Sequence, residues 1–292
     1  MNFFKFRKIP LAWLLLSRQP LRLLVAIAGI SFAGILMFMQ IGFRDGLFDT
    51  SVTIHNLLDA DLVLISPRSK SSISMSGFPK RRLIQALAQN EVKSISPVNL
   101  NYLLWRNPEN LKTRSILALG FNPNDSILLD KEFSQKANLL KNPGRVLFDS
   151  LSRPEFGPVE EWFKSGRKVQ TEVAGKRVLV EGLVELGPSF GADGNLITST
   201  ETYLKLFPAN PKGSIEIGLV KLMENSDSKK VSQILNKSLP NDVRVLTKDE
   251  FIEFEKNYWK TSTAIGFIFS LGAFMGFIVG CVVVYQILYS DV

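Results

Sequence analysis

Two long uncharged runs dominate the pattern of apolar and polar positions along the chain. Residues 23–43 form a run of 21 residues in which only Ser31 and Gln40 are clearly polar, and residues 264–289 form a second run of 26. An α-helix rises about 1.5 Å per residue, so each run can cross a hydrocarbon core of about 30 Å. A signal peptide has a shorter apolar region, and uncharged buried helices of this length are rare. The pattern therefore predicts two membrane spans.

Between the spans, short apolar runs alternate with turn residues. Runs rich in β-branched and aromatic residues predict strands at 62–66, 92–96, 115–121, 145–148, 169–173, 178–186, 195–198, 215–222 and 243–246. Helical periodicity predicts helices at 79–89, 201–207, 228–239 and 248–260. Residues 172–176 predict a hairpin turn, and the glycine-rich residues 187–194 predict a flexible loop. The expected fold is a membrane protein with two transmembrane α-helices and helical stalk extensions that flank a mixed α+β domain.

Apolar positions also recur at helical spacing directly outside the two spans. This stalk stripe consists of Leu47, Phe48, Ile54, Leu58, Phe251, Phe254 and Tyr258. The spacing predicts that each membrane helix continues outward for several turns and that the two stripes pack together as a stalk. The only histidine, His55, lies on this stripe, and we interpret it as a packed side chain rather than a ligand or a base.

Three glycines in the second span are spaced four residues apart. Gly272, Gly276 and Gly280 form two overlapping GxxxG motifs on one helix face. Such a face lets another helix approach closely, and in lipid this packing replaces the missing hydrophobic driving force. Close helix packing in the second span is the prediction, and it implies a partner protomer or further helices. The alternative is that glycine is simply common in membrane helices.

The charges indicate an orientation. The chain has a formal net charge of +8, and five basic residues with no acid precede the first span. Under the positive-inside rule the N-terminus is cytoplasmic and the central domain is periplasmic. Because much of the basic excess marks topology, nucleic acid is not an expected partner. Aromatic residues near the span ends, Trp13, Trp259, Tyr285 and Tyr289, are expected to anchor the chain at the two interfaces, with ordinary core packing as the alternative.

These patterns give one predicted organisation for a multi-pass protein of the plasma (inner) membrane. It comprises a cytoplasmic amphipathic segment (1–22), a first transmembrane helix (23–43), a periplasmic α+β domain with stalk helices (44–262), a second transmembrane helix (263–289) and the start of a cytoplasmic coupling segment (290–292).

Several kinds of chemistry are excluded by composition. With one histidine and one cysteine, the chain can build neither a Cys/His zinc site nor an intramolecular disulfide. It contains no GxxxxGK[ST], HExxH or GxSxG motif, and its spans hold no Asp, Glu, Lys or Arg. We therefore expect no catalytic, cofactor-binding or metal-binding residues and no enzymatic activity.

Long stretches of the sequence resemble a known family. They are IPLAWLLLSRQPLRLLVAIAGISFAGILMFMQIGFRDGLFD (9–49), LLDADLVLISP (57–67), LFDSLSRPEFGP (147–158), SFGADGNLITS (189–199) and YWKTSTAIGFIFSLGAFMGFIVGCVVVYQILYSDV (258–292). In these runs the chain resembles MacB/FtsX-type permease subunits of ABC transporters, and within them the cyanobacterial DevC type that exports heterocyst glycolipids.

The resemblance implies partners and a mechanism. Such permeases are homodimers that relay the closure of a separate cytoplasmic ABC ATPase into motion of a MacB-like periplasmic domain. That motion drives lipid-like or other cargo through a periplasmic membrane-fusion protein and an outer-membrane channel. The chain would bind no cofactor itself, because ATP is bound by the partner subunit. Family permeases have four spans, and this sequence stops where the coupling segment would begin, so we expect a fragment or a split gene product.

Two other functions fit the same layout. A two-span sensor or receptor also has an outer domain between two spans, but it needs a cytoplasmic output module. An FtsX-like scaffold would regulate cell-wall enzymes and transport nothing.

Overall fold

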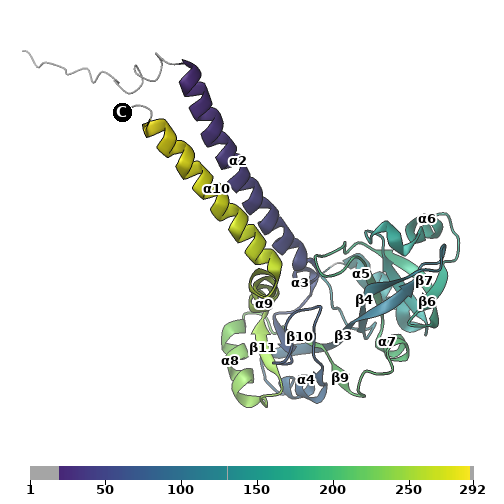
Figure 1. Cartoon of the computed structure of the whole chain (residues 1–292). Coiled ribbons are helices and arrows are strands. Elements are labelled where there is room, and N and C mark those ends of the chain that lie inside the picture. The colour runs from purple at the N-terminus through teal and green to yellow at the C-terminus, as the bar shows by residue number, and fades with distance from the viewer. Residues whose placement is uncertain (1–19, 130, 290–292) are drawn as a thin grey trace, which may run out of the picture. The chain divides into compact units, whose positions relative to one another are not determined.

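The computed structural model describes residues 20–129 and 131–289, which form two compact units (Figure 1). One unit contains residues 20–46 and 260–289, and the other is Leu47–Trp259. Most of the expected amphipathic segment (1–22), its anchor Trp13, and residues 290–292 lie outside the described residues.

The first unit is built from two apolar helices, most of α2 (Pro20–Ser51) and α10 (Ala264–Tyr289). Pro20 suits the first turn of α2 because that position needs no backbone donor. Both helices are long and apolar enough to cross a membrane, and only 6% of the most apolar window of each is buried. Two apolar helices flanking a mixed α/β domain are confirmed.

The predicted continuation of the helices holds for α2 and is wrong for α10. Helix α2 runs past Phe43 to Ser51 without interruption, whereas α10 is separated from α9 (Lys248–Thr261) by two non-helical residues, Ser262 and Thr263. The backbone segments on either side of this break approach each other closely: a Cβ atom at Gly266 would overlap the carbonyl oxygen of Lys260. Glycine at position 266 is what permits this close approach.

The second unit contains a mixed sheet of nine strands. In spatial order they are β11 (Arg244–Thr247), β1 (Leu62–Ile65), β10 (Ile217–Leu222), β3 (Val92–Arg106), β4 (Thr113–Phe121), β8 (Asn195–Ser199), β5 (Arg145–Asp149), β7 (Lys176–Val184) and β6 (Gln170–Val173). The pairs β4–β8 and β5–β7 are parallel, and the other pairs are antiparallel. A separate small sheet joins β2 (Phe78–Pro79) to β9 (Ser214–Ile215).

Strand β3 belongs to two substructures. Its first half pairs with β10, and its second half pairs with β4 over Val98–Arg106. At its end Trp105 pairs with Val173 of β6, which closes β3, β4, β8, β5, β7 and β6 into a ring of six strands. Figure 1 shows β3 running from the β10 side to the β4 side.

The predicted hairpin turn joins two strands of the ring. Ala174 and Gly175 connect β6 to β7 with φ angles of 49° and 73°. Positive φ at both central residues is the type I′ geometry, which matches the twist of two-residue hairpins.

The remaining helices cover the sheet. They are α3 (Thr53–Leu57), α4 (Arg81–Ala86), α5 (Lys131–Ala137), α6 (Val159–Lys164), α7 (Thr200–Leu206) and α8 (Ser228–Ser238), with 3₁₀ turns η1 (Asn138–Lys141) and η2 (Pro154–Phe156). One apolar cluster, built around Trp105 and Phe148, draws on the ring strands, α6 and α7. A second cluster lies where α4 and α8 meet the open part of the sheet, and a third includes Leu58 and Phe251.

Candidate functional site

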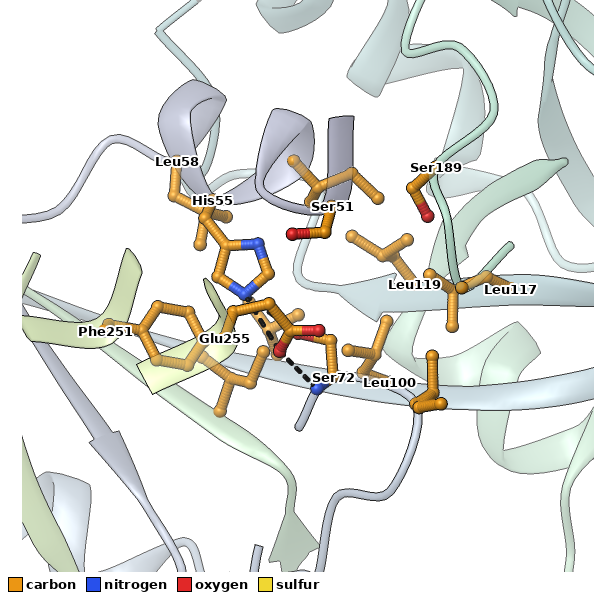
Figure 2. Close-up of a pocket in the computed structure, with 15 residues that line it drawn as sticks. Ser51, His55, Leu58, Ser72, Leu100, Leu117, Leu119, Ser189, Phe251 and Glu255 are labelled. Atoms are coloured by element: carbon orange, nitrogen blue, oxygen red, sulfur yellow. Dashed lines mark hydrogen bonds and ion pairs between the residues drawn. The ribbon is translucent and has the colours of Figure 1, made fainter. Parts of the chain in front are cut away.

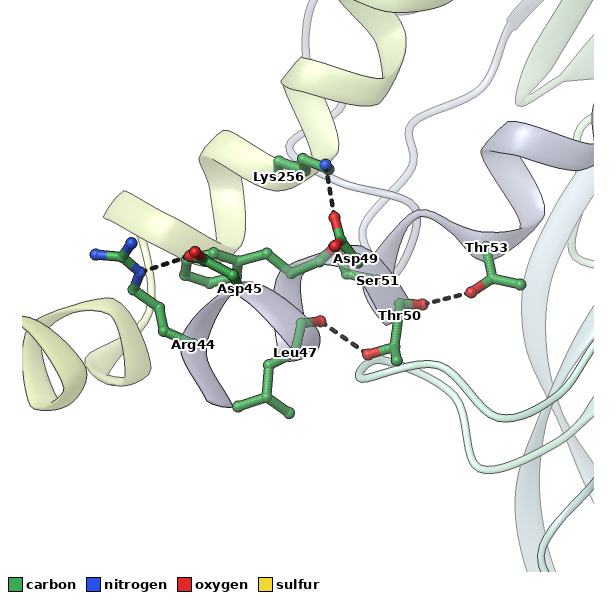
Figure 3. A network of polar contacts seen from close by, with 9 residues as sticks. Arg44, Asp45, Leu47, Asp49, Thr50, Ser51, Thr53 and Lys256 are labelled. Atoms are coloured by element: carbon green, nitrogen blue, oxygen red, sulfur yellow. Dashed lines mark hydrogen bonds and ion pairs between the residues drawn. The ribbon is translucent and has the colours of Figure 1, made fainter. Parts of the chain in front are cut away.

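Helix α2 ends inside the second unit, in a run of hydroxyl side chains. Thr50, Ser51 and Thr53 each donate to the carbonyl oxygen three residues earlier, at 2.8, 2.6 and 3.1 Å. Such bonds compete with the helical ladder and favour a break. Val52, with φ −111° and ψ 12°, interrupts the helix, and α3 follows. Figure 3 shows this turn and the ion pair of 2.9 Å between Asp49 and Lys256 of α9.

The residues of the stalk stripe lie against the sheet. Leu58 and Phe251 are buried in the third apolar cluster, and Ile54 and Phe254 pack against it. Phe48 is also buried, whereas Leu47 and Tyr258 are half-buried. The two stripes meet where the rings of His55 and Phe251 lie 4.6 Å apart. They therefore form part of the core of the second unit instead of a free-standing stalk.

A buried polar group, which we call the His55 cluster, lies at this meeting point (Figure 2). It consists of His55 from α3, Ser72 from the loop between β1 and β2, and Glu255 and Trp259 from α9. Nε2 of His55 lies 2.9 Å from Oγ of Ser72 and 3.6 Å from Oε2 of Glu255. The Glu255 carboxylate accepts the backbone N–H of Ser72 at 2.7 Å and the indole N–H of Trp259 at 2.9 Å. The expectation of a packed histidine is confirmed, since His55 is 4% exposed.

The surroundings shift the pKa values in this cluster. Burial acts to raise the pKa of the Glu255 carboxyl, but hydrogen bonds and positive charge from His55, with donors from Ser72 and Trp259, hold that pKa below its usual range. Burial, followed by the negative charge of Glu255, raises the pKa of the Tyr102 hydroxyl. The cluster therefore favours the charged form of the Glu255 carboxylate, although only 1% of this residue is exposed.

A small apolar cavity adjoins the cluster. Its volume is about 30 Å³, and its lining includes Ser51, His55, Leu100, Leu119 and Phe251. Nδ1 of His55 is buried and has no hydrogen-bond partner among the described residues. A cavity of this size has room for a water molecule that could pair with Nδ1.

A larger and more polar groove opens at one end of the sheet. It has a volume of about 430 Å³, and Asp61, Lys221 and Lys248 are among its lining residues. Lys221 pairs with Asp59 at 2.9 Å, and Nζ of Lys248 donates to the carbonyl of Leu58 at 2.7 Å. Among the described residues, no group of three or more His, Cys, Asp or Glu side chains could hold a metal ion.

The three predicted packing glycines face α2 of the same chain. A Cβ atom at Gly272 would lie 3.0 Å from Cδ of Gln40, one at Gly276 2.9 Å from Cγ of Met37, and one at Gly280 3.6 Å from Cβ of Ala33. The glycine face is therefore occupied within the pair of apolar helices. The inference from these glycines to a partner protomer or further helices loses its basis.

The expected interface anchors differ from one another. Tyr285 and Tyr289 are exposed on α10, and their rings stack with centroids 5.9 Å apart. Trp259 is instead buried within the second unit, where its ring contacts Phe190 and its N–H binds Glu255. The alternative of core packing is the one that describes Trp259, because a buried ring cannot reach a lipid headgroup.

Sequence reasoning missed Glu255 and Ser72. Glu255 carries a usable signal, because it stands four residues after Phe251 and four before Trp259, on the apolar face of the predicted helix. An acid on an apolar stripe indicates a buried carboxylate that needs partners. Ser72 lies in a loop, and we find no sequence signal for it.

Comparison with known proteins gives fold similarities at low identity. No protein-family model matches the chain, and no curated protein matches it. The structure is similar to the periplasmic region of MacB from Actinobacillus actinomycetemcomitans, at 12% identity and a TM-score of 0.44, over 70% of this chain and 96% of that one. It is also similar to the extracellular domain of the noncanonic ABC-type transporter YknZ from Gram-positive bacteria, at 13% identity and a TM-score of 0.43, over 64% of this chain and 99% of that one. Similarities at this level do not establish a function.

Proposed function

We propose that the chain is a membrane-spanning permease subunit of an ABC exporter. In this proposal it couples ATP hydrolysis by a separate ATPase subunit to motion of its α+β unit. The sequence resemblance described above, which covers five long runs from residue 9 to residue 292, supports this assignment. The apolar surfaces of α2 and α10 support a location in a bilayer, because water would not favour so much exposed apolar area.

The observation that carries the proposal is the continuity of α2. This single helix of 32 residues contains the first apolar run and ends among the buried residues of the α+β unit. A helix is stiff along its axis, so a displacement of its apolar part would be passed to the residues around Ser51. Since the apolar runs contain no charged side chain, mechanical relay is a better use for them than ion or proton transfer.

The proposed topology follows from charge. The basic N-terminal residues favour a cytoplasmic N-terminus, and the α+β unit would then lie on the periplasmic face of the inner membrane. The proposal further includes a homodimer, a fusion protein and outer-membrane channel as partners, and lipid-like cargo. ATP would be bound by the partner subunit, and the chain itself would need no cofactor.

The test is copurification of the full-length chain from native membranes. The tagged chain is extracted in mild detergent, and its partners are identified by mass spectrometry. We expect an ABC ATPase together with a membrane-fusion protein. As a matched control, Leu151→Glu changes an exposed apolar side chain of the α+β unit and should leave both partners bound.

Other outcomes would contradict the proposal. An ATPase that copurifies with a cell-wall hydrolase, and no fusion protein, would favour the scaffold. A signalling protein in place of any ATPase would favour the sensor. An ATPase whose turnover is unchanged by the chain in nanodiscs would also overturn the coupling role.

A further inference from the structure

Three segments that are far apart in the sequence meet at the His55 cluster. His55 belongs to α3, Ser72 to the loop between β1 and β2, and Glu255 to α9. Figure 2 shows their polar contacts converging on the carboxylate of Glu255, beside the apolar contact between the rings of His55 and Phe251. The cluster is therefore a polar point of attachment between α9 and both α3 and this loop.

The protonation of His55 determines whether the buried negative charge of Glu255 is compensated by a positive charge. When the imidazole is neutral, Glu255 is a buried carboxylate stabilised only by the N–H groups of Ser72 and Trp259 and by a neutral ring. When the imidazole is protonated, its Nε2 lies 3.6 Å from Oε2 of Glu255 while it is hydrogen-bonded to Oγ of Ser72, and the two buried charges compensate each other. A buried charge is costly alone and much less costly when paired.

Tyr102 of β3 is an ionisable group that interacts with Glu255. Burial, and then the negative charges of Glu255 and Asp193, raise the pKa of its hydroxyl, which donates to the carbonyl oxygen of Gly191. The strands beneath contribute apolar cavity-lining side chains, namely Val98, Leu100, Leu117, Leu119 and Ile217. The nearby Asp49–Lys256 pair is solvent-accessible, with 72% of the Asp49 side chain exposed, so water screens it.

We propose that the His55 cluster is a pH-sensitive latch, which ties α3 and the β1–β2 loop to α9 more firmly when His55 is protonated. Histidine is the side chain whose charge ordinarily changes between about pH 5 and 8. The cavity that His55 lines has room for a water molecule that accepts a hydrogen bond from the Nδ1–H of the imidazolium. The latch goes beyond the permease assignment and does not depend on it, because it needs only the α+β unit.

The chain offers a direct probe, since His55 is its only histidine. The full-length chain, labelled with ¹³C and ¹⁵N at histidine and reconstituted in nanodiscs, gives one imidazole signal by NMR. We expect Glu255→Gln to move the pH dependence of this signal to lower pH, because the substitution removes the negative charge 3.6 Å from Nε2. A signal whose pH dependence is unchanged by Glu255→Gln would overturn the proposal.

Stability provides an independent readout. His55→Gln should lower the thermal unfolding midpoint more at pH 5.5 than at pH 8, and we expect the two losses to differ by about 3 °C. Asp49→Asn breaks the exposed pair between α2 and α9 and should keep the wild-type pH dependence. If His55→Gln does not fold, Glu255→Gln takes its place, with the same expected loss of pH dependence. Equal pH dependence in the wild-type chain and the latch variant would contradict the latch.

The geometry of the latch can be followed as well. Spin labels at Thr50 and Glu253, both exposed, are introduced in a Cys281→Ser background. We expect the distance distribution between them to be narrower at pH 5.5 than at pH 8, and His55→Gln to remove the difference. A distribution that does not change with pH in the wild-type background would count against the latch.

Discussion

At the scale of single residues, Glu216 shows the cost of burying a carboxyl without a cation. Only 4% of this residue is exposed, and its Oε2 accepts hydrogen bonds from Nδ2 of Asn99 at 3.0 Å and the N–H of Leu100 at 3.1 Å. Burial raises the pKa of the Glu216 carboxyl above its ordinary value of 4.5, and the hydrogen bonds only partly oppose this. Its charged form therefore opposes folding at neutral pH.

We expect Glu216→Gln to remove a pH-dependent loss of stability. The raised pKa means that the folded chain binds this proton more tightly than the unfolded chain. The contribution of Glu216 to stability is therefore greatest below pH 4.5 and falls as the pH rises through the folded-state pKa. Thermal unfolding at pH 5 and pH 7.5 should give a smaller drop in midpoint for Glu216→Gln than for the wild-type chain.

Glu201→Gln is the matched control for this substitution. Glu201 is exposed and forms an i,i+4 pair with Lys205 at 2.7 Å, so its loss should leave the pH dependence nearly unchanged. Equal drops in the wild-type chain and Glu216→Gln would refute the argument from burial.

Trp259 marks the limit of what could be predicted for the candidate site. Its position near an apolar run predicts an interface anchor, and the same spacing also allows core packing. The choice between them depends on Phe190, whose ring contacts Trp259 only in the folded unit. Local spacing could predict the apolar stripe and Glu255, four residues earlier, as a partner for the indole N–H, but the contact with Phe190 comes from long-range packing.

At the scale of elements, α2 and α10 are matched along their contact. From one end to the other, Gly29, Ala33, Met37 and Gln40 of α2 face Val283, Gly280, Gly276 and Gly272 of α10. Val283, Met37 and Gln40 each lie opposite a glycine, so each of these larger side chains has space opposite it, and Ala33 faces Gly280. This arrangement accounts for glycines that the sequence alone assigned to an external helix.

A disulfide between Ala33→Cys and Gly280→Cys should form within one chain. The Cβ atoms would be 3.6 Å apart, which lies in the range of natural disulfides. In a Cys281→Ser background, oxidation should give a monomeric cross-linked chain by non-reducing electrophoresis and peptide mass spectrometry. Phe32→Cys with Gly280→Cys is the control and should cross-link poorly, because Phe32 is 60% exposed. A cross-linked dimer as the main product would show that the glycine face contacts another protomer.

Strand β3 was only half predictable. The sequence predicts a strand at 92–96, but the pattern is then interrupted by Pro97 and by two asparagines, and the observed strand continues to Arg106. Asn99 can lie in the sheet because its amide donates to Ser214 O at 3.2 Å and to Glu216 at 3.0 Å. The bounds of most other strands were predicted within a few residues, since a short apolar run in the local sequence is enough to indicate a buried strand.

At the scale of the whole molecule, the α+β unit is self-contained. Its three apolar clusters draw only on residues between positions 54 and 254. The ends of α2 and of α9 contribute buried side chains to it, including Phe48 and Phe251. The unit therefore includes these helix ends as structural parts.

Residues 47–259 expressed alone should give a soluble, cooperatively folded protein. We expect one thermal transition, with coincident near-UV and far-UV circular dichroism curves, because the clusters are complete within this segment. Residues 62–259, which lack Val52, His55 and Leu58, are the comparison and should unfold at lower temperature. Aggregation of both segments, or equal midpoints, would contradict this division of the chain.

Strand β3 pairs with β10 in the open part of the sheet and with β4 and β6 in the ring, and these pairings are expected to form in a particular order. Its pairing with β4 joins residues close in sequence, whereas the contact of Trp105 with Val173 closes a loop of more than sixty residues. Short loops lose less chain entropy on closure and form faster. We therefore expect the β3–β4 hairpin to be the folding nucleus and the ring to close late, so that substitutions in this hairpin slow refolding while those at β6 mainly speed unfolding.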